Sequence, residues 1–184
     1  MNFKRFLNIT AALALGAFTL QSCDEGLAVT LANQTIEIDV EVKSTTDTGS
    51  ITFANDTLAF NLQAEIDSAG LEYDVANIQS IKLNGVSIVI NDDSSMVQNF
   101  DALSHVSANF ATTTQPNIEI ANLPTVPSGL DSLFLNLGQT ELLDYLKSDT
   151  LFFSLSGGND QPIVDDVKVK AIIDYDITVL PNVE

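Results

Sequence analysis

The chain has few of the residues from which catalytic and metal sites are usually built. Its 184 residues include one cysteine, Cys23, one histidine, His105, and no tryptophan. A single cysteine excludes an intramolecular disulfide, and a single histidine leaves no zinc site of ordinary composition and no Cys-His pair. A Ser-His-Asp triad would need His105, which strand parity places on an exposed face, and no Gly-x-Ser-x-Gly elbow accompanies it. The composition therefore predicts a protein that is not an enzyme and uses no cofactor.

Positive charge is scarce as well. There are 7 basic residues against 25 acidic ones, and the chain beyond residue 22 keeps five Lys and no Arg against all 25, a formal charge of −20. Nucleic acids and anionic lipid headgroups are bound largely through Lys and Arg, so we expect neither as a partner. Such acidity is typical of proteins that stay soluble and repel one another on a crowded surface. Cation binding is the alternative interpretation.

A short apolar run lies near the amino terminus, between Lys4-Arg5 and Cys23. It extends from Phe6 to Leu20, which is shorter than the ~20 residues of a membrane-spanning helix but sufficient for a secretory leader. Leu20 is too bulky for the third position before an ordinary signal peptidase cut, where small residues are favoured. We therefore expect an exported protein without a permanent membrane span.

The leader ends in Leu20-Gln21-Ser22-Cys23, which resembles the lipobox of bacterial lipoproteins, although Gln21 departs from the small residue usual at its position. The resemblance implies diacylglycerol on the thiol of Cys23, cleavage of residues 1–22, and acylation of the new amino terminus. Two or three acyl chains hold a protein to a bilayer essentially permanently. The alternative, an incidental thiol beyond a conventional leader, would leave an exported protein with one unpaired reactive cysteine.

The residues after Cys23 bear on the location of the protein in the cell. Asp24-Glu25 are similar to the export signal of surface lipoproteins in Bacteroidetes-type bacteria, and this resemblance implies the outer membrane. In other bacteria an Asp at this place implies retention at the inner membrane. The expected partners are the lipid bilayer, through acylated Cys23, and other proteins of the cell envelope.

Residues 34–184 are expected to form a single domain behind a short tether, residues 23–33, because the 162 residues left after cleavage suit one hydrophobic core. Apolar and polar residues alternate at period two, as in half-buried strands, over residues 36–42, 51–53, 58–66, 81–90, 106–110, 118–120, 133–137, 151–155 and 167–179. The predicted fold class is all-β, an antiparallel β-sandwich of seven to nine strands. The pattern resembles an immunoglobulin-like sandwich and, more faintly, the late-embryogenesis-abundant type 2 domain, and it carries no motif of either.

Four local features accompany these strands. Gly85 stands where the apolar parity switches and predicts a β-bulge, and residues 157–160, Gly-Gly-Asn-Asp, predict a turn. Residues 71–77 are expected to make one helical turn. Thr140 is the expected N-cap of a short helix over residues 140–147, with Glu141 early and Lys147 late, as the helix dipole favours.

Paired carboxylates are the candidate metal ligands. Oxygen ligands for Ca²⁺ at the edge of a sandwich could come from Asp92, Asp93, Asp165 and Asp166, and from Asp174 and Asp176. Their spacing is not that of an EF-hand loop, and turns or a solvated strand face explain the same carboxylates. Two carboxylates could also hydrolyse a glycoside, but the aromatic platforms that usually hold sugars are scarce here. A carboxylate-based hydrolase is therefore the least favoured function.

Four triplets match the Asp-Ser/Thr-apolar pattern of the O-glycosylation system found in Bacteroidetes-type bacteria. Their acceptor residues would be Thr57, Ser68, Ser132 and Thr150. All four are expected near the ends of strands or turns, where a glycan could be accommodated. The alternative is that Asp followed by Ser or Thr simply begins strands and turns.

The function predicted from these features is that of a membrane-anchored lipoprotein with a non-catalytic binding, assembly or surface-structural role. The alternative is a carrier that holds an apolar ligand between the sheets, in a cavity lined by Phe60, Phe110, Leu135 and Phe153. Phe152-Phe153 requires one ring on each side of its strand. One ring must therefore meet something besides the core, either another part of the chain or a partner.

Overall fold

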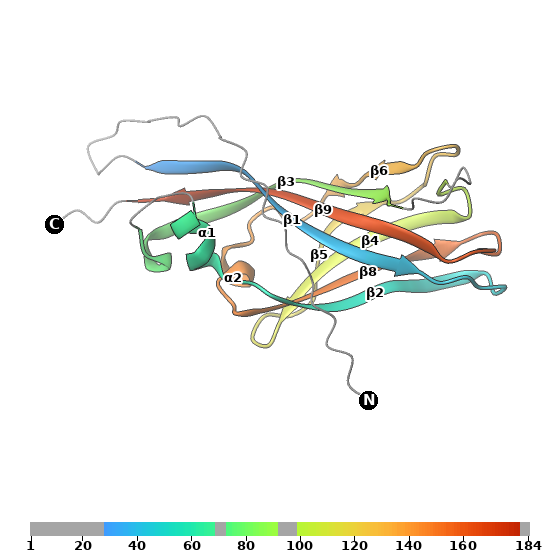
Figure 1. Ribbon diagram of the computed structural model, residues 1–184, viewed down its shortest axis with the longest axis horizontal. Helices are drawn as coiled ribbons and strands as arrows, with labels where there is room; N and C mark the ends of the chain where they lie inside the picture. The colour runs from blue at the N-terminus through green and yellow to red at the C-terminus, as the bar shows by residue number, and fades with distance from the viewer. Residues whose placement is uncertain (1–27, 69–72, 92–98, 181–184) are drawn as a thin grey trace.

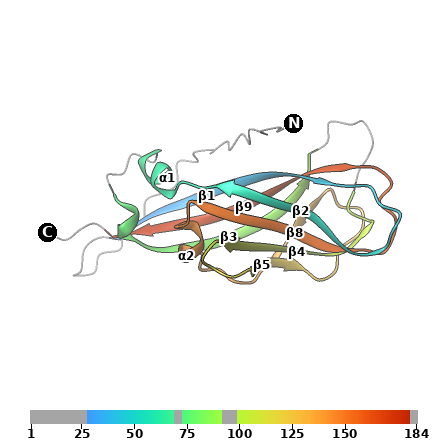
Figure 2. The same ribbon diagram turned by 90° about the horizontal axis from the view of Figure 1, so that it is seen from below.

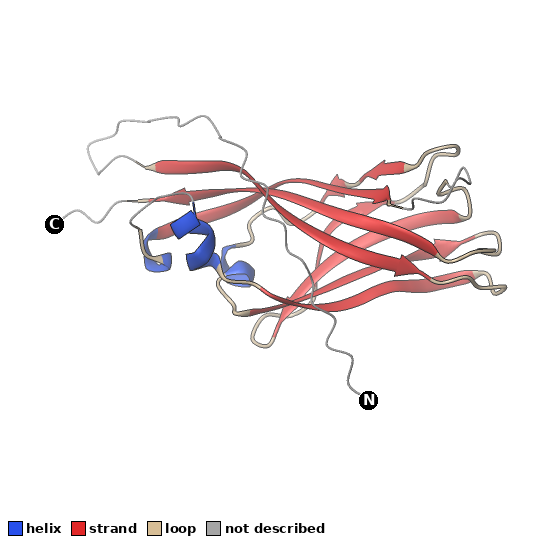
Figure 3. Cartoon of the chain, in the orientation of Figure 1, coloured by secondary structure: helices blue, strands red, loops and turns tan. Residues whose placement is uncertain are grey.

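The computed structural model describes residues 28–68, 73–91 and 99–180, and these form two antiparallel sheets packed face to face (Figures 1 and 3). The strands are β1 (Val29–Val42), β2 (Gly49–Ala59), β3 (Ile78–Ile90), β4 (Leu103–Thr112), β5 (Ile118–Leu123), β6 (Ser132–Phe134), β7 (Asn136–Leu137), β8 (Thr150–Asn159) and β9 (Val167–Val179). The predicted all-β, antiparallel β-sandwich is confirmed.

The strand order separates the chain into a four-stranded sheet, β1-β9-β3-β6, and a five-stranded sheet, β2-β8-β4-β5-β7. The carboxy-terminal strand β9 is central in the first sheet, between β1 and β3. Its strict alternation buries every second side chain from Val169 to Val179, as the sequence predicts. The register between β3 and β9 shifts between Leu83 and Gly85, so the bulge expected at Gly85 is confirmed.

Aromatic side chains from both sheets fill the space between them. Phe110 and Phe153 are fully buried and pack edge to face, with ring centroids 5.9 Å apart. Phe60 packs against Tyr175 in the same manner at 6.5 Å. Burial of one such ring contributes roughly 1.5–3 kcal/mol, and an edge-to-face pair adds about 0.5–1.5 kcal/mol. The Phe60–Tyr175 contact joins the end of β2 to β9 of the other sheet, whereas Phe110 and Phe153 are paired on neighbouring strands of one sheet.

Short helices cover one end of the sandwich (Figures 1 and 2), namely α1 (Leu62–Ser68), η1 (Val75–Asn77) and α2 (Leu143–Leu146). The strand predicted over residues 58–66 is therefore wrong beyond β2, because α1 begins at Leu62. Leu62 and Ile66 are both buried, and their spacing of four satisfies the helical repeat as well as the strand repeat. The Asn61 side chain accepts a hydrogen bond from the Ala64 N–H at 3.1 Å, which favours the helix. The turn expected within residues 71–77 appears as η1, while residues 69–72 lie outside the described part.

The helix predicted over residues 140–147 is present but shorter, and its cap was predicted wrongly. Thr140 does not cap it; the Thr140 carbonyl accepts a hydrogen bond from the Leu83 N–H at 2.7 Å at the edge of β3. The carboxylate of Glu141 accepts from the Ile81 N–H at 3.0 Å and from the Leu143 N–H at 3.1 Å. One oxygen of Glu141 thus accepts hydrogen bonds from a backbone N–H at the edge of β3 and from another at the start of α2.

Two further boundaries differ from the prediction. The apolar stretch at 133–137 is divided between the two sheets, as β6 and β7, because Leu135 points into the core between them. Residues 157–159 continue β8 and do not form a turn, because a glycine at 157 lets the His105 carbonyl approach closely. β1 begins at Val29, so part of the predicted tether 23–33 is strand.

Candidate functional site

The outer face of the five-stranded sheet carries a group of mostly uncharged polar side chains. Strand pairing sets them in two rows across the sheet, and Figure 2 shows β2, β8, β4 and β5 side by side. One row contains Thr52, Ser156, Ser107, Asn122 and Asn136. The next row contains Asn55, Ser154, Asn109 and Glu119. We call these nine residues the Ser/Asn face.

Glu119 organises one side of the Ser/Asn face. Its carboxylate accepts hydrogen bonds from the Ser107 hydroxyl at 2.7 Å and from the Asn122 amide at 2.5 Å. The Asn109 amide in turn donates to the Ser107 hydroxyl at 3.4 Å. The sequence pattern did not single out Glu119, because its neighbours are set by the register between β4 and β5. The only sequence signal was the run of Ser and Asn at alternate positions of β4.

The outer face of the four-stranded sheet is charged. Its outward residues include Glu37, Asp39, Glu41, Lys82, Lys168, Lys170, Asp174 and Asp176, which we call the charged face. Lys170 and Glu37 form an ion pair at 2.8 Å, with both side chains about a third exposed. The hydrogen bond to Glu37 raises the pKa of Lys170. Asp174 and Asp176 accept hydrogen bonds from the Thr35 hydroxyl and the Asn33 N–H, both at 2.8 Å.

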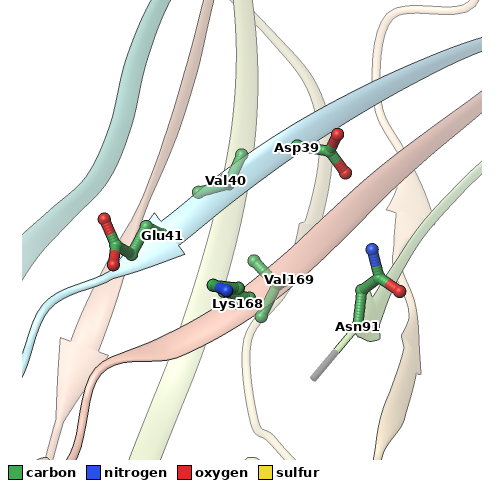
Figure 4. A pocket seen from close by; sticks show the side chains of 6 residues that line it. All are labelled: Asp39, Val40, Glu41, Asn91, Lys168 and Val169. Atoms are coloured by element: carbon green, nitrogen blue, oxygen red, sulfur yellow. The ribbon is translucent and has the colours of Figure 1, made fainter. Parts of the chain in front are cut away.

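A pocket of about 410 Å³ opens on the charged face (Figure 4). It is lined by Asp39, Val40, Glu41, Asn91, Lys168 and Val169. Strand pairing sets Glu41 opposite Lys168, and the Asn91 N–H donates to the Lys168 carbonyl at 2.8 Å. The pocket therefore offers carboxylate, ammonium and amide groups to a small polar solute. Its described lining contains no nucleophile paired with a base.

The candidate calcium ligands are not brought together among the described residues. Asp166 lies in the loop before β9, where its carboxylate accepts hydrogen bonds from the Lys43 ammonium and the Ser44 N–H, each at 2.8 Å. The hydrogen bond from Lys43 is the main cause that lowers the pKa of Asp166 to about 2. Asp165 is exposed beside it, and Asp92 and Asp93 lie outside the described residues. In the described part no group of three His, Cys, Asp or Glu side chains is placed to hold a metal ion.

The candidate modification sites fall at the ends of elements. Ser132 and Thr150 are half-buried at the first positions of β6 and β8, and Ser68 is exposed at the last position of α1. Thr57 is exposed on β2, near its end. Cys23 lies outside the described residues. Within the part of the chain that is described, no helix is both long and apolar enough to span a bilayer.

His105 is exposed on β4, as strand parity predicts. Its Nδ1 lies 3.1 Å from the hydroxyl of Ser104, and its ring lies over Gly158. No carboxylate among the described residues is hydrogen-bonded to His105. A Ser-His pair without an acid that orients the imidazole is an incomplete triad.

The cavities described in and beside the core are too small for an apolar ligand of lipid size. Two described cavities lie among core residues, with volumes of about 10 Å³ and about 30 Å³. A single water needs roughly 10–15 Å³, whereas a site for a lipid-sized ligand needs roughly 300 Å³ or more. Phe60, Phe110, Leu135 and Phe153, which were predicted to line a ligand cavity, line neither of them.

Burial raises the pKa of two groups near the helical end. Glu65 on α1 is half-buried, and desolvation raises the pKa of its carboxyl. Burial also raises the pKa of the Tyr175 hydroxyl, with a smaller contribution from the negative charge of Glu65. A raised carboxyl pKa suits a general acid, but a hydrolase of this type needs a second carboxylate across the substrate. The described hydrogen bonds and ion pairs join no second carboxylate to Glu65.

Comparisons with known proteins add little. No family model matches the chain, and no curated protein matches it. A solved structure from Desmodium yellow mottle tymovirus aligns with 100% of this chain and 98% of its own, at 11% sequence identity and a TM-score of 0.27. A likeness at this level carries no argument about fold or function.

Proposed function

We propose that the protein is a lipoprotein of the bacterial envelope, held by acyl chains on Cys23, whose β-sandwich has a non-catalytic binding, assembly or surface-structural role. The observation that carries this proposal is the sequence Leu20-Gln21-Ser22-Cys23 after a short apolar run that follows Lys4-Arg5. The outer membrane is the proposed location, from Asp24-Glu25. Thr57, Ser68, Ser132 and Thr150 remain proposed O-glycosylation sites.

The position of the first strand supports an anchored domain. β1 begins at Val29, six residues after Cys23. Six residues span at most about 20 Å when fully extended. A domain joined to the bilayer at Cys23 would therefore stay close to the membrane surface. The small volumes of the cavities described in and beside the core also favour a role on the outer faces of the sandwich over that of a carrier with an internal ligand.

The proposal is tested by growing cells with radiolabelled palmitate and isolating the wild-type chain, Cys23→Ala and Ser22→Ala. We expect label on the wild type and on Ser22→Ala, because a small residue is kept before the cysteine. Cys23→Ala should carry no label and should keep the mass of the uncleaved chain. The acyl label is the decisive measurement, because Cys23→Ala with an uncleaved leader would also sediment with the membrane fraction. An unlabelled wild type would refute the anchor.

A further inference from the structure

We infer that the Ser/Asn face binds a neutral, hydroxyl-rich polymer, of which an uncharged polysaccharide is the natural example. This goes beyond the proposed function and does not depend on acylation of Cys23. It arises from three properties of the face: side-chain hydrogen-bonding groups without partners, an almost complete lack of charge, and one carboxylate and one aromatic ring at its margins.

The side of the face formed by β2 and β8 offers free hydrogen-bonding groups. The side chains of Thr52, Asn55, Ser154 and Ser156 make no hydrogen bond to another described residue, and all four are at least partly exposed. Adjacent strands lie about 4.8 Å apart, so these groups form a regular array of donors and acceptors. Each hydroxyl or amide can both donate and accept. Because the side chains are short and fixed on a sheet, little conformational entropy is lost when a ligand binds them.

The charge distribution selects the kind of ligand. Glu119 is the one charged side chain in the two rows, although the chain as a whole has a formal charge of −18. An anionic polymer would be repelled by the surrounding acidic surface, and a cationic one would be drawn to the charged face and the acidic loops. The most exposed large apolar side chains, Phe134 and Val164, lie outside the Ser/Asn face. A ligand that is neutral and rich in hydroxyl groups is therefore the best complement.

Two residues at the margins suit the same ligand. The Glu119 carboxylate keeps lone pairs beyond those used by Ser107 and Asn122, and can accept from a sugar hydroxyl. Phe152 is half-buried and shares a row with Thr57 and Ala111, on the opposite side of β8 from Phe153. Its ring can pack against the apolar face of a sugar. This assigns a role to the outward ring of the Phe152-Phe153 pair.

The test uses the purified full-length protein in detergent, run on native gels that contain amylopectin, mannan, xylan or β-glucan, with polygalacturonate and chitosan as charged comparisons. Thr52→Lys and Ser156→Lys place a long charged side chain on the Ser/Asn face. Ser87→Lys places the same side chain on the outer face of the other sheet, at a similarly half-buried strand position. Thermal unfolding checks that each variant is folded. Because Thr52 is more exposed than Ser156, Thr52→Lys serves as the second variant if Ser156→Lys does not fold.

We expect at least one neutral polysaccharide to slow the migration of the wild-type protein and of Ser87→Lys. Thr52→Lys and Ser156→Lys should bind the same polysaccharide about ten-fold more weakly, which is equivalent to roughly 1.4 kcal/mol. Binding to no neutral polymer would overturn the inference. Equal weakening by Ser87→Lys would do the same. A concentration-dependent dimer that Ser156→Lys dissociates would overturn it as well, because the face would then bind a second copy of the chain. None of these outcomes bears on the acylation of Cys23.

Discussion

The two sheets of this sandwich are alike on the side that faces the core and different on the side that faces solvent. Both bury alternate aliphatic and aromatic residues, and together they form one continuous core. Outside, one sheet carries carboxylates and ammonium groups, and the other carries Ser, Thr and Asn side chains with Glu119 alone charged in its two rows. The inner pattern determines the fold, so the outer pattern is free to differ, and that difference is where function is best sought.

The largest expected difference between the sheets concerns one glycine in each. A Cβ at residue 157 in the five-stranded sheet would overlap the His105 carbonyl oxygen and lie 2.9 Å from the Phe53 ring. A Cβ at residue 85 in the four-stranded sheet would lie 3.4 Å from the Asp174 carboxylate, which can move. We expect Gly157→Ala to lower the free energy of unfolding by about 3 kcal/mol and Gly85→Ala by less than about 1 kcal/mol, measured in urea. Equal losses would show that β8 tolerates a side chain there.

A second prediction concerns the edge of the four-stranded sheet, where the Glu141 side chain accepts a hydrogen bond from the backbone of β3. Glu141→Ala removes the acceptor of the Ile81 and Leu143 N–H groups. We expect a loss of about 1–3 kcal/mol in the free energy of unfolding, because backbone donors would be left without a protein partner. Glu141→Gln keeps an acceptor oxygen and should recover most of the loss. If Glu141→Gln is as unstable as Glu141→Ala, the two hydrogen bonds are not what stabilises this edge.

The third prediction contrasts the outer faces directly through their salt dependence. Lys170→Met breaks the ion pair with Glu37 but keeps an unbranched side chain. We expect it to lower the free energy of unfolding by less than about 1 kcal/mol in 50 mM salt, and by less still in 1 M salt, where charges are screened within about 3 Å. Asn109→Ala on the Ser/Asn face should show no salt dependence. The contrast fails if both variants respond alike to salt.

The smallest expected effect is local and depends on pH. The hydrogen bond from Lys43 lowers the pKa of Asp166 in the folded protein to about 2, below the ordinary value of an aspartate. The hydrogen bond between Lys43 and Asp166 therefore stabilises the folded protein above the ordinary pKa of an aspartate, and this stabilisation is lost as the pH falls through about 2. NMR titration should place the Asp166 carboxyl near 2 in the wild type and nearer its usual range in Lys43→Met. Titration at the usual value in both would exclude the ion pair.

Strand alternation predicted the fold class because burial on one face dictates a period of two, and β9 shows the strength of that rule. The secondary structure was predicted wrongly where the same residues are compatible with two different structures. Leu62 and Ile66 fit a strand or a helix, and the Asn61 side chain together with packing at the end of the sandwich decides for the helix. Gly157-Gly158 resembles a turn, but the close approach of β4, which depends on tertiary pairing, makes it strand.

The candidate sites were less predictable than the fold. Acidic pairs are visible in the sequence, but the partners of a carboxylate are not, and Asp166 proves to be paired with Lys43. The Ser/Asn face depends on the register of strands far apart in the chain, since Thr52, Ser156 and Ser107 become neighbours only through β8. Alternation identifies which residues point outward, while pairing determines what they form together.

The proposed function depends most directly on how the chain is attached to its membrane. Intact mass spectrometry of the protein isolated from its native envelope measures this in one experiment. We predict an amino-terminal residue Cys23 that carries a diacylglycerol thioether and an additional acyl group on its nitrogen. A mature chain that begins at another residue, or a Cys23 whose sulfur carries no lipid, would contradict the proposal.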